Sequence, residues 1–223
     1  MKRSMNAVNA ALLSLALVAG CGEIVSSPSE PAAQPRTVRL SAAQAQRLQR
    51  VMTPLLAAAD KPMSPRDVSI ALIEDPSINA ANAGSKRFYI TTGLLEKAND
   101  EQLRGVLAHE IAHDDLGHVA KAQVLGAGLN IGVVLLEQLI PGSSALTPIA
   151  GTLIAQGYSR QEEYAADRHG VEILQRAGYP PQTMTRTLQW IMREEGSAAS
   201  GGGFFSSHPG TEDRIAALQK ITG

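Results

Sequence analysis

The chain has 223 residues, and its 20 Lys and Arg are set against 21 Asp and Glu, so that the formal net charge is -1. Such a balance gives no excess of positive charge for binding nucleic acid, and a nucleic-acid-binding protein is therefore not expected. The length is sufficient for one domain with a sizeable core and is short for two. Because aromatic residues make up only 4% of the chain, that core has to be built from Leu, Ile, Val and Ala.

The first twenty residues are typical of a secretory signal. A basic head precedes an apolar run over residues 10–19, and residues 17–21 read Leu-Val-Ala-Gly-Cys. This sequence resembles a bacterial lipobox, in which the leader is cut before the cysteine and the cysteine is lipidated. The alternative is an ordinary signal with a stray cysteine, but Cys21 is the only cysteine and cannot form an internal disulfide. We therefore predict a lipoprotein signal peptide at residues 1–20 and a membrane anchor on Cys21.

The lipidated cysteine is expected to begin a flexible tether over residues 21–38. This stretch is rich in Ser, Pro, Glu and Ala and has almost no large apolar residue. Gly22 stands where lipoproteins retained at the inner membrane of enteric-type bacteria carry an aspartate. By that resemblance we expect the periplasmic face of the outer membrane in the bacterial cell envelope, with the folded domain at residues 39–223.

The folded domain is predicted to begin with a helix and a small sheet. Ser41 is suited to cap a helix that runs to about residue 59, and Pro54 is expected to kink or split it. Short extended segments follow at residues 67–73, 77–82 and 86–91. A small sheet is therefore expected directly before the next helix.

That next helix, capped by Asn99 or Asp100, carries His109-Glu110-Ile111-Ala112-His113. At about 100° per residue, positions four apart lie about 40° apart around the axis, so His109 and His113 project from one face and can hold one metal ion. Glu110 lies on the flank of that face, where its carboxylate can take a proton from water at the metal. The alternative is a chance pattern on an ordinary amphipathic helix, and the surrounding sequence has to decide between them.

A catalytic zinc ion usually takes three protein ligands, so a third one has to be found. The extended motif with a third histidine fails, because Leu116 and Val119 stand where its glycine and histidine should be. His118 is five residues past His113 and would lie on the far side of the helix from His109 if the helix continued. We therefore predict that His118 is a surface or second-layer histidine.

The region over residues 119–155 is very apolar and rich in glycine. Several polar side chains and the break at Pro141-Gly142 leave no clean run of about 20 apolar residues, which is the length that a membrane-spanning helix needs. We interpret it as a helical hairpin that is either buried in the protein or faces the membrane.

A second helical segment offers the missing ligand. Glu163 and Asp167 are four residues apart, so they share one face of the helix. Glu163 can be the third ligand, and Asp167 can accept a hydrogen bond from the non-metal nitrogen of a ligating histidine. The alternative is a solvated acid pair, but two like charges at this spacing repel by a few tenths of a kcal/mol, which a nearby cation would reverse.

Taken together, these segments resemble the gluzincin family that includes HtpX and the CAAX prenyl proteases, and above all its short bacterial lipoprotein members. The matching segments, in the order of the family, are Asn79-Ala80, Thr91 to Leu95, His109 to His113, Glu163 to Asp167, and Ser207-His208-Pro209. The resemblance implies one zinc ion, held by His109, His113 and Glu163, with Glu110 as the general base. It also implies an α+β fold, a mainly helical, zincin-like metallopeptidase domain with a small β-sheet packed beside the zinc-binding helix.

The resemblance further assigns residues to the substrate. In zinc peptidases a strand that lines the cleft usually binds the peptide through main-chain hydrogen bonds, and Asn79 and Ala80 are the candidate edge. The alternative is that Asn79 serves a turn. His208 is the candidate donor to the carbonyl oxygen of the substrate in the transition state. The alternatives are a solvated loop residue or a fourth zinc ligand in a closed state.

The C-terminal part is expected to contain a mobile loop and a last helix. Residues 197–203 are rich in glycine and serine and lead to Phe204 and Phe205 in an exposed loop, as a lid, a pocket wall or a hydrophobic plug. Whether the loop before His208 covers the zinc until a substrate displaces it is left open. Arg214 is expected to pair with an acid of the site.

Two functions are consistent with these motifs. The first is a zinc endopeptidase that acts on misfolded or misassembled envelope proteins. The second is a periplasmic assembly factor that binds outer-membrane protein substrates with little cleavage, its zinc being structural. Glu110 favours the enzyme, because a purely structural site has no use for a base beside an open metal position.

Overall fold

A computed structural model describes residues 36–120, 157–196 and 203–223, which all belong to the compact unit Gln34–Gly223. Some of the predictions concern residues 1–35, 121–156 and 197–202 and lie outside the described residues. These are the signal peptide, Cys21, nearly all of the apolar hairpin, and the glycine-serine loop.

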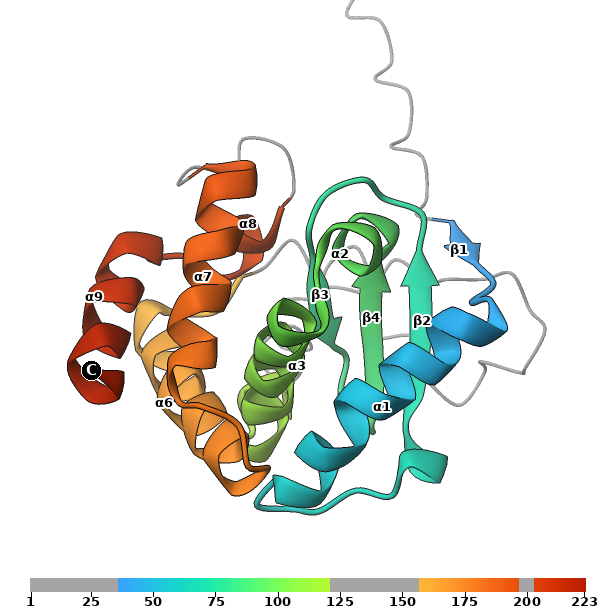
Figure 1. The fold of residues 1–223 in the computed structure, drawn as a ribbon, viewed down its shortest axis with the longest axis horizontal. Helices are drawn as coiled ribbons and strands as arrows, with labels where there is room; N and C mark the ends of the chain where they lie inside the picture. Colours follow the sequence, from blue (N-terminus) through green and yellow to red (C-terminus); the bar gives the residue numbers. More distant parts are fainter. Residues whose placement is uncertain (1–35, 121–156, 197–202) are drawn as a thin grey trace, which may run out of the picture. The chain divides into compact units, whose positions relative to one another are not determined.

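The sheet has four strands in the order β1-β2-β4-β3 (Figure 1). The strands are β1 (Thr37–Val38), β2 (Ser69–Ile73), β3 (Ala80–Asn82) and β4 (Arg87–Thr91). β4 pairs parallel with β2 and antiparallel with β3, and β1 pairs antiparallel with β2. Three of these strands fall within the predicted extended segments. The sequence did not predict β1, since its two residues form a strand only through the partner that the fold supplies.

Helix α1 (Ala42–Ala58) begins at the predicted cap, where the Ser41 side chain accepts from the backbone of Gln44. Of the two predicted effects of Pro54, a kink or a split, the split is wrong, because the helix continues through the proline. A proline inside a helix costs about 3 kcal/mol or more. Leu55 and Leu56, directly after it, are buried, and burying two leucines contributes roughly 3–6 kcal/mol. Packing therefore offsets the cost of the proline.

Helix α3 (Asp100–Asp115) is the centre of the molecule. It is capped by Asn99, one of the two predicted caps, and contacts α1, β3, α6 (Arg160–Arg176) and α7 (Gln182–Glu195). Every residue from Gly105 to His113 is buried. A Cβ atom on Gly105 would lie 2.1 Å from Oγ1 of Thr187, so the glycine lets α7 approach this closely. The helix that carries the metal motif is thus held on all sides.

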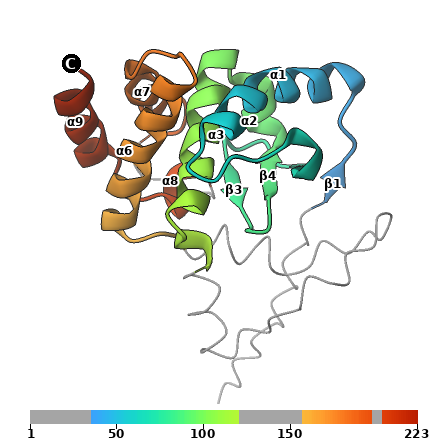
Figure 2. The ribbon, with the colours of Figure 1, turned by 90° about the horizontal axis from the view of Figure 1, so that it is seen from below.

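The described residues also form the helices α2 (Thr92–Lys97), α8 (Phe204–Ser207) and α9 (Thr211–Thr222), and the single 3-10 turn η1 (Pro65–Asp67). In the views of Figures 1 and 2, β1 and α9 lie at opposite ends of the described part, with α3 between the sheet and the pair α6 and α7. Among the helices in the described ranges, none is both long enough and apolar enough to cross a bilayer. The predicted mainly helical fold with a small sheet beside the motif helix is confirmed.

Candidate metal centre

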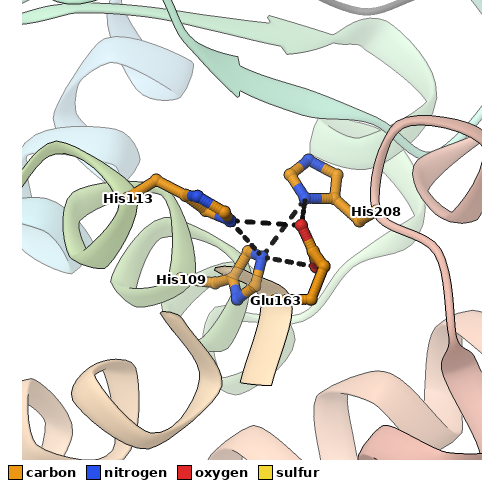
Figure 3. Close-up of side chains that lie close together, drawn as sticks. All are labelled: His109, His113, Glu163 and His208. Carbon is orange, nitrogen blue, oxygen red and sulfur yellow. Dashed lines mark hydrogen bonds and ion pairs between the residues drawn. The ribbon is translucent and has the colours of Figure 1, made fainter. Parts of the chain in front are cut away.

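Four buried side chains from three segments meet beside α3 (Figure 3). Nε2 of His109 lies 3.1 Å from Nε2 of His113 and 3.2 Å from Nδ1 of His208. The Glu163 carboxylate approaches the same atoms, at 3.0 Å from His208 and 3.3 Å from each of the other two rings. Hence α3 supplies two potential ligands, α6 supplies one, and the segment after α8 supplies the fourth.

The spacing of these atoms fits a small tetrahedral ion. Zinc binds nitrogen and carboxylate oxygen at about 2.0–2.1 Å, so two ligands of a tetrahedral site are separated by about 3.3 Å. The separations given above, which involve one or the other oxygen of Glu163, are 3.0–3.3 Å and are close to that value. Imidazole and carboxylate are also ligands that zinc prefers.

The charge of the buried groups likewise fits a divalent cation. Three buried carboxylates, those of Glu110, Glu163 and Asp167, face one buried guanidinium, that of Arg214, so these four groups carry a net charge of -2. Burial by itself lowers the pKa of His109, but Glu163 and Asp167 outweigh it and raise that pKa to about 9. In the absence of a metal, the carboxylates thus draw a proton onto the ring. A bound Zn²⁺ would supply the positive charge instead.

Glu110 is fully buried next to the four ligand atoms. Its Oε2 accepts a hydrogen bond from the backbone of Asn82 at 2.9 Å, and its Oε1 lies 3.4 Å from Nε2 of His208. Burial raises the pKa of this carboxyl above its ordinary value, and His208 and His109 offset part of the rise. A buried carboxylate with a raised pKa beside a metal position has the properties of a general base.

The structure also brings Asp167 to the back of His109. Its Oδ1 lies 3.1 Å from Nδ1 of His109, the nitrogen that faces away from the other ligand atoms. Arg214 holds this carboxylate in turn, with Nε and Nη2 donating at 2.8 and 2.7 Å. Nη1 of Arg214 also pairs with Glu163. The predicted pairing of Arg214 with an acid of the site is therefore confirmed.

His118 lies elsewhere than the continuous helix predicted. Helix α3 ends at Asp115, and Gly117 has a φ of 72°, in the left-handed region that glycine adopts readily. The regular helix is interrupted there, and Nδ1 of His118 lies 3.0 Å from Nδ1 of His113. Of the two predicted environments, surface or second layer, the structure shows the second.

Phe204 and Phe205 are buried, so the expectation of an exposed loop is wrong. They form the short helix α8, and the Phe204 ring stacks on His208 with the ring centroids 4.3 Å apart. Glu195, at the end of α7, accepts hydrogen bonds from the backbone of Phe204 and of Ile78. Of the predicted roles, the arrangement matches the hydrophobic plug, which holds His208 against the other ligand atoms.

The candidate substrate strand lies beside Glu110. β3 is the outer strand of the sheet, and the backbone of Asn79 bonds to Thr91 at the end of β4. Alternation along a strand therefore turns the main-chain groups of Ala80 and Asn82 away from β4, and on that side the Asn82 N–H donates to Glu110. Asn79 itself is buried, and its Oδ1 accepts from the Ala80 backbone at 2.8 Å. The N–H groups of Ala80 and Asn82 have acceptors within the protein, so direct main-chain contact with a peptide falls to their carbonyl oxygens.

Tyr158 was missed by the sequence reasoning. Its ring stacks on His113 with the centroids 3.8 Å apart, and its backbone donates to the Ser207 carbonyl. Burial, together with the nearby Glu110, raises the pKa of its hydroxyl. The available signal was an aromatic residue directly before Ser159, which caps α6.

A second group of metal-type side chains, Asp60, Asp115 and His169, lies apart from the four ligands. Asp115 accepts from the backbone of Asp60 and contacts Nε2 of His169, whose Nδ1 contacts Glu172. Arg176 pairs with Asp60. The atoms of this group already have protein partners. We therefore interpret the group as a set of polar contacts that connects the ends of α1 and α3 to α6.

The comparisons with known proteins agree with this geometry. The sequence pattern of Peptidase family M48 matches residues 42–222. The Beta-barrel assembly-enhancing protease of Escherichia coli (strain K12) is 33% identical over 159 residues, which cover 65% of this chain and 32% of that protein. A Protease HtpX homolog of Salinibacter ruber is 31% identical over 220 residues, covering 82% of this chain and 77% of the relative. One of Burkholderia thailandensis is 32% identical over 215 residues, covering 77% and 73%. The chain thus spans about a third of the length of the E. coli relative.

Proposed function

The chain belongs to peptidase family M48 as a zinc metallopeptidase, and from this premise we propose that it is an endopeptidase with one zinc ion held by His109, His113 and Glu163. One observation carries the proposal. The donor atoms of these side chains converge at tetrahedral spacing with the buried carboxylate of Glu110 next to them.

The residues of the site suit peptide hydrolysis. When bound, the zinc would lower the pKa of a water and polarise the peptide carbonyl. Glu110 takes the proton from the attacking water and passes it to the leaving nitrogen. Its Oε2 is held by the Asn82 backbone, which leaves Oε1 on the side of the ligand atoms. Asp167, fixed by Arg214, holds His109 in the required orientation from behind.

We propose that β3 binds the substrate. An extended peptide laid along the outer edge of β3 would donate from its amides to the carbonyl oxygens of Ala80 and Asn82, next to Glu110. Such pairing reads the backbone more than the side chains, so it selects unfolded segments rather than a particular sequence. Misfolded or misassembled envelope proteins are the substrates that present them. The name of the E. coli relative, a β-barrel assembly-enhancing protease, is consistent with this class.

We further propose that His208 covers the site at rest. Its Nδ1 lies 3.2 Å from Nε2 of His109 and 3.0 Å from Oε1 of Glu163, a spacing that suits ligands of one ion. The buried Phe204 stacks on its ring. This position supports the alternative of a fourth ligand in a closed state. The role of oxyanion donor needs His208 to move away first, and it stays a prediction. A covered site also favours the second function, an assembly factor that binds envelope proteins and cleaves them little.

The location of the protein is proposed from its sequence. The Leu-Val-Ala-Gly-Cys segment and the lone cysteine support lipidation at Cys21. A lipid there would anchor the metallopeptidase domain to a membrane of the cell envelope, at the periplasmic face of the outer membrane, where misassembled envelope proteins are found.

The decisive test compares the full-length protein with its Glu110→Gln form. The variant should keep one zinc per chain, by metal analysis, and lose casein digestion by about 10²–10⁴-fold, the usual value of a general base. Glu96→Gln, which removes the same charge from an exposed position of α2, is the control and should keep full activity. Equal digestion by the Glu110→Gln form and its parent would favour the assembly factor.

A further inference from the structure

His118 contacts the rear of a zinc ligand, and the motifs assign it no role. Nε2 of His113 faces the other ligand atoms, and its second nitrogen, Nδ1, lies 3.0 Å from Nδ1 of His118. Between the two histidines, α3 ends at Asp115 and Gly117 adopts a left-handed conformation. His118 is partly buried there, with its ring centroid 5.0 Å from that of His113.

The chemistry of imidazole fixes what this contact can be. A neutral ring that offers Nε2 to a cation carries its proton on Nδ1. His113 would therefore donate from Nδ1, and the acceptor would be Nδ1 of a neutral His118 whose own proton is on Nε2. Hydrogen bonds of this kind fix the tautomer and orientation of a metal ligand. We infer that His118 is a positioning residue that holds His113 ready for zinc, an inference that rests on the proposed role of His113 as a ligand.

The two zinc histidines would then be held in different ways. Behind His109 the acceptor is the carboxylate of Asp167 at 3.1 Å, whereas behind His113 it is a neutral ring. A charged acceptor makes a stronger hydrogen bond and raises the basicity of the ligand. A carboxylate in place of His118 should therefore hold zinc at least as firmly as the parent does.

A competing explanation is that packing alone fixes His113, since the Tyr158 ring stacks on it at 3.8 Å. The side chain at position 118 can separate the two explanations. Oδ1 of Asn or Asp is bonded to Cγ, as Nδ1 of His is, so either residue keeps an acceptor atom at the same place. Leu places a methyl group there, which fills space but accepts nothing.

The test uses full-length, zinc-loaded protein and a coloured chelator in excess, and it measures the rate of zinc release. His118→Leu should release zinc about 10–100-fold faster than the parent. His118→Asn should stay within a few-fold of the parent, and His118→Asp should release zinc no faster than the parent. Leu116→Ala changes an exposed residue at the end of the same helix and should match the parent.

The outcomes are distinct. Equal release by the His118→Leu form and the parent overturns the inference. So does equally fast release by the Leu and Asn forms, since packing of the ring would then be what matters. Thermal unfolding of the metal-free proteins should be alike for Leu and Asn, and loss of stability in the Leu form alone would reduce the contact to a structural one. A parent that binds no zinc contradicts the proposed function as well, whereas a zinc-binding parent with an unaffected Leu form contradicts only the role of His118.

Discussion

Arg214 donates two hydrogen bonds to Asp167, through Nε at 2.8 Å and Nη2 at 2.7 Å, and both side chains are buried. Burial by itself would raise the pKa of Asp167, but Arg214 outweighs it and holds that pKa below its ordinary value. The guanidinium of α9 thus keeps the carboxylate behind His109 charged. It ties the C-terminal helix to the metal centre.

Arg214→Met should destabilise the fold strongly. It leaves the buried carboxylates of Asp167 and Glu163 without their cation, and breaking a buried pair in this way costs about 3–5 kcal/mol. Urea unfolding of the metal-free protein measures the loss. Arg193→Met removes an exposed arginine of α7 and should change the free energy of unfolding by no more than about 0.5 kcal/mol. A loss from Arg214→Met as small as that of the control would show that the pair contributes little.

Asp167→Ala should lower zinc affinity or activity by about 10–100-fold, because His109 loses the acceptor on its Nδ1. Competition with a chelator of known zinc affinity gives the first quantity, and casein digestion the second. Asp213→Ala removes an acid of α9 that pairs with Arg160 at the surface, and it serves as the control. An Asp167 variant with parental zinc retention and rate would make Asp167 a structural partner of Arg214 only.

The pairing of side chains within each of the two helices of the site could be predicted from sequence because its geometry is local. Helical periodicity sets the relation of His109 to His113 and of Glu163 to Asp167, and no knowledge of the rest of the fold is needed. The family match confirms the resemblance that these motifs indicated. The contact of His118 with His113 was not predicted, because the far-side position assumed a helix that continues past Gly117, whereas Gly117 has a left-handed conformation and α3 ends before it.

The parts that the sequence did not predict depend on distant partners. Phe204 and Phe205 were expected in an exposed loop, but the backbone of Phe204 bonds to Glu195 and its ring packs on His208. Likewise, β1 is a strand only because β2 lies beside it. Neither partner can be read from periodicity, since each is brought close only by the complete fold.

Backbone recognition by β3 predicts a particular response to modified substrates. N-methylation of a single peptide amide that faces the strand removes one hydrogen bond, which contributes about 0.5–1.5 kcal/mol. Cleavage should then fall by about 2–13-fold in kcat/KM, measured on a series of peptides methylated one position at a time. Side-chain replacements at the same positions should matter less. A series in which methylation is tolerated everywhere would rule out β3 as the substrate strand.

Cys21→Ala should leave the precursor uncut by lipoprotein signal peptidase and without a lipid, because the lipobox needs its cysteine. Incorporation of a labelled fatty-acid analogue, followed on a gel, measures the result. The wild-type protein should carry the label, and Ser29→Ala, within the predicted tether, should label like the wild type. An unlabelled wild-type protein would contradict the proposed anchor.

His208→Ala decides between the two roles of this residue. If His208 covers the zinc at rest, the variant should still bind zinc through its three other ligands and should cleave casein faster than the parent. The gain could reach about 10-fold or more, since a minor open state is typically 0.1–10% populated. We expect this result from the position of Nδ1 among the ligand atoms. Ser206→Ala, on α8 and exposed, is the control.

A loss of about 10²–10³-fold in kcat, with zinc and substrate binding nearly unchanged, would instead assign His208 to the carbonyl oxygen in the transition state. The sign of the change in kcat therefore tells whether the histidine guards the site or takes part in the reaction.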